Sequence, residues 1–319
     1  MEGQTYAPGD MVDFTADAAY SDGDIIQVPD GRAGVVRGAV ASGSNGSAEV
    51  TEGLIVTVPK TTSMVMLISS ELFWDHSANK AHLLHGGDRD FFLGTCQKDE
   101  TSSATTVRVA LNKRPRYAVS LADGFATIPI QTAGFPVVHG AGEGVNLQLQ
   151  AANEAQKIDA LSIRSITVAG LAECIGHALI CVNDNGGATA ADTNIGFANG
   201  THATDADSIT EAAFVHLDGN DLNISLASRD GTTTVAITDS TIDFVEGTPF
   251  LVQWDFRNLA DIQTYVNGVL ALPSSVFKLD AAAGPIKALA HMEKTSSTDT
   301  YRTSVVRLGL TAAQNMLGV

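Results

Sequence analysis

Hydrophobic residues recur in short runs over the first 113 positions, and turn residues separate the runs at short intervals. The clearest runs span 25–28, 54–58, 64–68, 91–94 and 106–111. No helical period of 3.6 residues persists through this region. Runs of about four to eight residues, divided by turns every 8–12 residues or so, are typical of an all-β barrel or sandwich. We therefore expect residues 1–113 to form one all-β domain.

Residues 151–319 show the same kind of pattern with stricter alternation. Leu222, Ile224 and Leu226 alternate with polar neighbours. In the stretch 250–257, Phe250, Val252, Trp254 and Phe256 alternate with Leu251, Gln253, Asp255 and Arg257. The pair Asn267-Gly268 is a strong hairpin signal. This pattern predicts an antiparallel β-sandwich, with one short helix around 153–157.

Residues 114–150 differ from both flanking blocks, because Pro129 and Pro136 interrupt them and a glycine-rich run at 139–144 closes them. We interpret this stretch as an extended connector lying on a surface. Its apolar side chains are too few to form a core of their own and predict a contact with a partner surface. The candidate contact residues are Phe125, Ile128, Ile130 and Phe135.

The charge balance excludes several classes of partner. The chain has 36 acidic and 19 basic residues, a net charge of -17. Such a surface repels phosphate backbones and anionic lipid, so we expect neither nucleic-acid nor membrane binding. No apolar run is long enough to span a bilayer, and the first residues do not resemble an export signal. The three cysteines form no recognisable disulfide framework.

Known catalytic motifs are missing from the sequence. It contains no phosphate-binding glycine loop, no G-x-S-x-G elbow and no H-E-x-x-H pair. We therefore expect no enzymatic activity and no cofactor.

Two polar clusters could in principle bind a metal ion. The first could bind zinc but matches no standard spacing, so we favour exposed loop residues. The second could bind calcium but lacks the complete loop pattern, so we favour solvated acidic loops. The members of the first cluster are Asp75, His76, His82, His85, Asp88 and Asp90, and those of the second are Asp184, Asn185, Asp192, Asp205 and Asp207. Trp254 and Tyr265 could form a sugar-stacking platform, but the phase of Trp254 with Phe250 favours a core position.

The N-terminal block resembles the decoration (cement) proteins of tailed-phage capsids. The resemblance depends on the order of several segments over about a third of the chain. These segments span 21–28, 32–39, 54–60, 72–75, 79–80, 92–95 and 106–112. The resemblance implies a small β-barrel that sits outside the capsid, commonly as a homotrimer, and bridges neighbouring major capsid subunits.

The C-terminal block resembles the concanavalin-like (laminin-G-like) jelly rolls. The resemblance is carried by the Trp-bearing stretch 247–255 and by the Tyr-Val-Asn-Gly hairpin within 262–269. Such folds often bind glycans, but many are purely structural, and a fold does not fix a function. No sugar-binding loop residues are recognisable here.

Together these features predict an all-β structural virion protein. We expect a capsid-binding β-barrel at 1–113, a connector at 114–150 and an outward-facing antiparallel jelly-roll β-sandwich at 151–319. The protein would be made in the host cytoplasm and would stabilise the outer surface of the assembled capsid, with the major capsid protein and itself as partners. The alternative is a capsid-displayed adhesin that binds glycans, and a glycan-degrading enzyme is a weaker rival.

Overall fold

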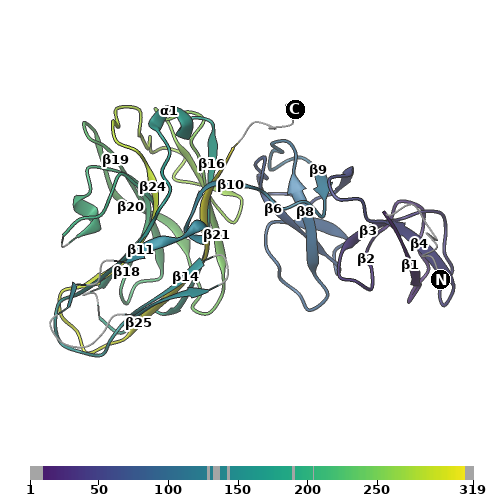
Figure 1. The fold of residues 1–319 in the computed structure, drawn as a ribbon, viewed down its shortest axis with the longest axis horizontal. Coiled ribbons are helices and arrows are strands. Elements are labelled where there is room, and N and C mark those ends of the chain that lie inside the picture. Colours follow the sequence, from purple (N-terminus) through teal and green to yellow (C-terminus); the bar gives the residue numbers. More distant parts are fainter. Residues whose placement is uncertain are drawn as a thin grey trace, which may run out of the picture. The chain divides into compact units, whose positions relative to one another are not determined.

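The computed structural model describes residues 10–127, 130–131, 137–141, 144–188, 191–203 and 205–312. The chain divides into two compact units, Met1–Pro115 and Arg116–Val319. Each unit consists almost entirely of antiparallel strands (Figure 1). Among the described residues, no helix has the length and apolar character needed to cross a membrane.

The first sheet of unit 1 has four strands in the order β1-β4-β3-β2. Their bounds are Met11–Thr15 (β1), Ile25–Gln27 (β2), Ala33–Val36 (β3) and Asn45–Glu49 (β4). Inward-facing residues form a small core of their own, which includes Phe14, Val36 and Ala48. Gly46 faces this core, and an added Cβ would lie 2.5 Å from a Val40 methyl carbon.

The second sheet of unit 1 has five strands in the order β5-β9-β8-β6-β7. Their bounds are Ile55–Pro59 (β5), Glu71–Asp75 (β6), Lys80–His82 (β7), Phe91–Cys96 (β8) and Thr106–Leu111 (β9). A parallel bridge between Lys60 and Ala81 brings the two outer strands of this sheet together. The expected all-β fold is confirmed, but a single closed barrel over 1–113 is not, because the strands are divided between two sheets.

Asn112 joins the two sheets of unit 1. It follows β9 with a φ of 58°, and its side chain reaches the other sheet. Its Oδ1 accepts a hydrogen bond from Ala33 N at 2.9 Å, and its Nδ2 donates to the carbonyls of Ala33 (2.9 Å) and Val50 (3.1 Å). One side chain thus makes three hydrogen bonds across the junction.

Unit 2 is a sandwich of two eight-stranded sheets. The first has the order β13-β14-β25-β16-β21-β22-β23, and β10 also pairs with β25. Its strands are Tyr117–Ser120 (β10), Val137–Ala141 (β13), Gly144–Leu149 (β14), Cys174–Asp184 (β16), Phe250–Asp255 (β21), Gln263–Val266 (β22), Val269–Ala271 (β23) and Tyr301–Ala312 (β25).

The second sheet of the sandwich has the order β11-β15-β24-β17-β18-β19-β20, and β12 also pairs with β15. Its strands are Phe125–Thr127 (β11), Ile130–Gln131 (β12), Gln156–Ser162 (β15), Ala191–Ala198 (β17), Glu211–Asp218 (β18), Asn223–Asp230 (β19), Thr234–Asp243 (β20) and Lys287–Lys294 (β24). Three helical turns complete the unit: Leu121–Asp123 (η1), Val168–Leu171 (α1) and Ala206–Ser208 (η2). The helix expected around 153–157 is not formed there, because the chain already enters β15 at Gln156.

One hydrophobic core fills the space between the two sheets of unit 2. Phe197 of β17 lies at its centre and makes edge-to-face contacts with Trp254 and Phe256, each at 5.4 Å between ring centroids. Trp254 is only 2% exposed, which confirms its core position and excludes it from a sugar-stacking platform. The predicted antiparallel sandwich is therefore confirmed, since alternating residues of both sheets meet in this core.

The stretch 114–150 is part of the sandwich rather than a connector. β10 pairs with β25, β11 and β12 pair with β15, and β14 lies between β13 and β25. Of the glycines that suggested a connector, Gly140 lies within β13 and Gly144 begins β14. Since strands of the stretch occupy edge and near-edge positions in both sheets, unit 2 begins at about residue 116.

Candidate functional site

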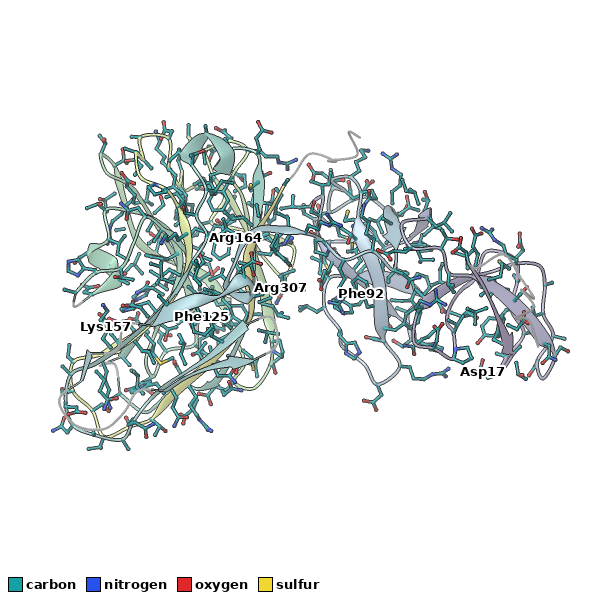
Figure 2. The ribbon with its side chains drawn as sticks, viewed as in Figure 1. Asp17, Phe92, Phe125, Lys157, Arg164 and Arg307 are labelled. Carbon is teal, nitrogen blue, oxygen red and sulfur yellow. The ribbon has the colours of Figure 1, made fainter. Side chains whose placement is uncertain are left out.

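Two of the four predicted contact residues, Phe125 and Ile130, lie in the described part of the chain. Phe125 lies on β11 of unit 2 (Figure 2), where it is half-buried and packs against the sandwich core. Ile130 lies on β12, where its backbone pairs with Lys157. Ile128 and Phe135 lie outside the described residues.

The histidine cluster of unit 1 is held together as a loop. Several contacts of this loop are made by Asp90. The Oδ2 atom of Asp90 accepts hydrogen bonds from Gly86 N (2.9 Å) and Gly87 N (2.8 Å). Its carbonyl contacts His85 Nε2 at 2.9 Å, and its Oδ1 accepts from His76 N at 3.2 Å. These carboxylate oxygens satisfy backbone donors, so the contacts favour the interpretation as loop residues.

The second predicted cluster separates into residues with different partners. Asp184 accepts hydrogen bonds from Thr300 Oγ1 (2.8 Å) and Gly186 N (3.1 Å), and Asn185 donates to the carbonyl of Asp218 at 3.0 Å. Asp205 caps η2. Asp192 and Asp207, in contrast, meet a histidine that the sequence analysis did not single out.

That histidine belongs to a set of ionisable and amide side chains on the second sheet of the sandwich. They lie on the sheet surface that faces away from the main core, and four adjacent strands contribute two each. We call this set the polar face. Its residues are Lys157 and Asp159 (β15), His291 and Glu293 (β24), Asp192 and Asn194 (β17), and His216 and Asp218 (β18).

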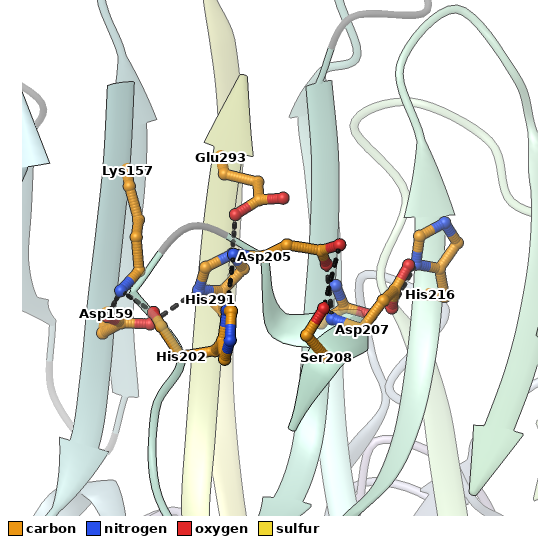
Figure 3. Close-up of polar contacts among 10 residues, drawn as sticks. Lys157, Asp159, His202, Asp205, Asp207, Ser208, His216, His291 and Glu293 are labelled. Atoms are coloured by element: carbon orange, nitrogen blue, oxygen red, sulfur yellow. Dashed lines mark hydrogen bonds and ion pairs between the residues drawn. The ribbon is translucent and has the colours of Figure 1, made fainter. Parts of the chain in front are cut away.

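The segment between β17 and β18 covers part of the polar face (Figure 3). Ala206 and Ile209 from this segment form a second, smaller core with Ala212, Phe214 and Leu289 of the sheet. The segment also places Asp207 Oδ1 3.5 Å from His216 Nδ1. Polar side chains beneath it are therefore buried, although they lie on the outside of the sandwich.

On one side of the polar face, Asp159 joins a lysine and a histidine. Its Oδ2 lies 2.7 Å from Lys157 Nζ, and its Oδ1 lies 2.6 Å from His291 Nδ1. His291 Nε2 contacts Glu293 Oε2 at 2.9 Å. Burial alone would lower the pKa of His291, but the hydrogen bonds and charges of Asp159 and Glu293 outweigh it and raise this pKa. His291 is thus the cation between two carboxylates.

On the other side of the polar face, His216 lies among Asn194 and three aspartates. Its Nδ1 is 3.0 Å from Asn194 Oδ1, and its Nε2 is 3.0 Å from Asp218 Oδ1. One ligand atom from each of Asp192, His216 and Asp218 lies within 4.8 Å of the other two. These three side chains are the group in the described part of the chain whose spacing suits a metal ion.

The protonation of this group is strongly perturbed. Burial raises the pKa of Asp192 to about 7; the charge of His216 opposes this shift and that of Asp218 adds to it. For His216, burial lowers the pKa, but hydrogen bonds and charges of Asp207 and Asp218 dominate and raise it to about 9. The aspartates around His216 therefore carry more negative charge than the protonated imidazole of His216 can neutralise.

Comparisons with known proteins follow the division into two units. A family model of phage cement proteins matches residues 6–111, which confirms the resemblance of the N-terminal third. No curated protein matches the chain.

Solved structures similar to the chain include sugar-binding and sugar-cleaving domains. The carbohydrate recognition domain of Emp47p is 8% identical and covers 61% of this chain and 93% of its own, with a TM-score of 0.42. A carbohydrate-binding module from Bacillus subtilis is 9% identical and covers 57% and 92%, with a TM-score of 0.36. The catalytic domain of a laminarinase from Thermotoga petrophila is 9% identical and covers 56% and 81%, with a TM-score of 0.38. Likenesses this distant carry no argument about what the chain binds.

Proposed function

We propose that this chain is a structural protein of a phage virion that binds the outside of the assembled capsid through unit 1 and stabilises it. The observation that carries the proposal is the match to phage cement proteins over residues 6–111, which coincides with unit 1 (Met1–Pro115). Unit 2 is the projecting domain in this proposal. A protein that binds only the assembled shell stabilises that state by mass action and needs no catalytic residues.

The partial burial of Phe125 supports a capsid contact on unit 1 alone. Phe125 packs against the sandwich core, so it serves the stability of unit 2. We therefore propose that unit 1 makes the contact with the major capsid protein, without the stretch 114–150 that we expected to share it. A homotrimer around a capsid symmetry axis remains part of the proposal and is tested by light scattering of the purified protein.

Co-sedimentation with undecorated expanded capsids tests this assignment. The full chain is compared with a chain that ends at Pro115 and with one that begins at Arg116, each first checked for a cooperative unfolding transition. The 1–115 chain should bind within about tenfold of the full chain, or ~1.4 kcal/mol. Capsid binding by the 116–319 chain, without binding by the 1–115 chain, would reverse the assignment.

The proposal also holds that the chain is not an enzyme. Glycoside hydrolysis uses two carboxyl groups that flank an accessible bond, about 5–9.5 Å apart. On the polar face, Asp159 is fully buried and Glu293 is 9% exposed, and both are bound to His291. A hydrolysis assay on a polysaccharide panel should show no turnover, and a glycan array tests the alternative of a carbohydrate-binding adhesin.

A further inference from the structure

The carboxylates of the polar face are aligned in a row across three neighbouring strands. In the strand register, Asp192 lies directly opposite Glu293 on one side and directly opposite Asp218 on the other. Side chains at directly opposed positions have Cβ atoms about 4.5–5.5 Å apart, and like charges there destabilise a sheet. A row of three carboxylates is therefore stable only with a proton or a cation between its members.

His216 presents one ring nitrogen to this row. Its Nδ1 faces Asn194 Oδ1 at 3.0 Å, and since that oxygen can only accept, Nδ1 carries the proton. The lone pair of Nε2 is then directed toward Asp218 Oδ1, 3.0 Å away. Two lone pairs cannot face each other at this distance without a proton or a cation between them. Metal-binding histidines are typically fixed in this way, by a hydrogen bond from the second ring nitrogen to an oxygen.

Asn194 provides a second observation at the same position. It is fully buried, and its Nδ2 has no hydrogen-bond partner, although its Oδ1 contacts His216. Buried amide groups without a partner are rare and call for a bound water or ligand. Asn194 lies directly opposite His216 in the strand register and two residues from Asp192 on β17, so a water bound to a cation at this position would supply the missing acceptor.

The nature of the ligand atoms selects a class of cation. One imidazole nitrogen and two carboxylate oxygens suit zinc and related first-row transition metals, whereas calcium and magnesium prefer oxygen ligands alone. The side chain of Asp218 is 47% exposed, which leaves a path from solvent and room for water to complete the coordination.

We propose that Asp192, His216 and Asp218 form a binding site for one divalent transition-metal cation, with Asn194 orienting His216 and holding a metal-bound water. This site lies within unit 2 and does not depend on the proposed capsid contact. The competing occupant of the same position is a proton on His216, which requires no metal.

Zinc titration of the untagged full chain, stripped of metal with a chelator, distinguishes the two occupants. We expect one zinc ion per chain with a micromolar dissociation constant in a competition assay with a chromophoric chelator. Zinc in 100-fold excess over that constant should raise the unfolding temperature of unit 2 by about 5 °C or more. Cobalt bound at the same site should give visible absorption bands.

The variants assign the site. Asp218→Asn should weaken zinc binding at least tenfold while the protein still unfolds cooperatively, because this side chain is half-exposed. Asp243→Asn removes an equal charge from the exposed end of β20 and should leave zinc affinity unchanged. Asp192→Asn should weaken binding but raise the unfolding temperature without metal, since it shortens the row of like charges. Absence of zinc binding at 1 mM, or affinity unchanged in Asp218→Asn, would overturn the proposal; the second result would place the zinc elsewhere, such as at His76.

Discussion

Replacing Phe197 by Ala should destabilise unit 2 while leaving unit 1 unchanged. Phe197 has no exposed surface and lies between Trp254 and Phe256, with both ring contacts at 5.4 Å. It also packs against the backbone at Gly176, where an added Cβ would come within 2.6 Å of its ring. The ring therefore fills a closely packed space, and we expect its removal to leave a cavity.

The expected magnitude follows from the cost of removing a buried aromatic ring. Phe→Ala substitutions in closely packed cores cost about 3–5 kcal/mol, from lost burial and from the cavity left behind. In a unit of this length, 1 kcal/mol corresponds to a shift of about 2–4 °C in unfolding temperature. The unfolding temperature of unit 2 should therefore fall by roughly 6–20 °C.

Differential scanning calorimetry of the full chain measures this shift. Leu93→Ala is the matched substitution in unit 1, because Leu93 is also fully buried and lies on β8. We expect two transitions, each moved by only one of the two variants. The reasoning is refuted if either variant shifts both transitions together, or if Phe197→Ala moves the unit 2 transition by less than about 2 °C.

Substitutions at three further positions test other parts of the structure. Burial lowers the pKa of His177 to about 3, so His177 stays neutral in the folded protein. In the unfolded chain it takes up a proton below about pH 6.5. The free energy of unfolding therefore falls by up to ~1.4 kcal/mol per pH unit between about pH 6.5 and pH 3. His177→Gln should therefore lose less stability than the wild type between pH 7 and pH 4.5 in urea unfolding, and an equal loss in both would contradict the shift. Asn112→Ala should lower the unfolding free energy of unit 1 by about 2–4 kcal/mol through three lost hydrogen bonds. Asn112→Asp should lose at least as much, because its second carboxylate oxygen would face the carbonyl oxygens of Ala33 and Val50; full stability of either variant in urea unfolding would contradict this. Gly196→Ala should prevent normal pairing of β17 with β18, since its Cβ would lie 2.2 Å from the Ala213 carbonyl oxygen; soluble protein with an unchanged circular dichroism spectrum would disprove this.

The pattern of apolar and turn residues predicted the strands of the sandwich correctly where the paired residues are close in sequence. The Asn267-Gly268 hairpin forms as expected, with φ values of 50° and 78° and with Val266 paired to Val269. The alternation at 250–256 correctly predicted buried Val252 and Trp254, but Leu251 and Gln253 on the opposite face are buried too. In these segments, the side-chain period and the turn residues specify the structure without long-range information.

The stretch 114–150 was misinterpreted because its pairing partners are distant. β10 pairs with β25, and β11 pairs with β15, so neither strand is recognisable from its own short sequence. Without these partners, the proline and glycine residues of the stretch favour its interpretation as a connector. Only the opposite strand explains why these few residues are extended and paired.

The polar face was missed for a different reason. Lys157 and Asp159 alternate with Ile158 and Ala160, which is also the pattern of a strand with one solvated surface. Nothing in that pattern indicates that Ala206 and Ile209 fold over the same surface. The useful signal was the paired spacing of His216 with Asp218 and of His291 with Glu293, two residues apart on strands with otherwise apolar alternation.

The position of β25 has a consequence for how the protein is made. This last strand lies between β16 on one side and β10 and β14 on the other, so the first and last strands of unit 2 are direct neighbours. During synthesis, unit 1 can complete its sheets as soon as it leaves the ribosome. The strands of unit 2 that pair with β25 stay unpaired, and therefore prone to aggregation, until residues 301–312 emerge. Only then can β25 take its place at the centre of the first sheet. A nascent chain stalled before Tyr301 should therefore carry a folded unit 1 and a protease-sensitive unit 2.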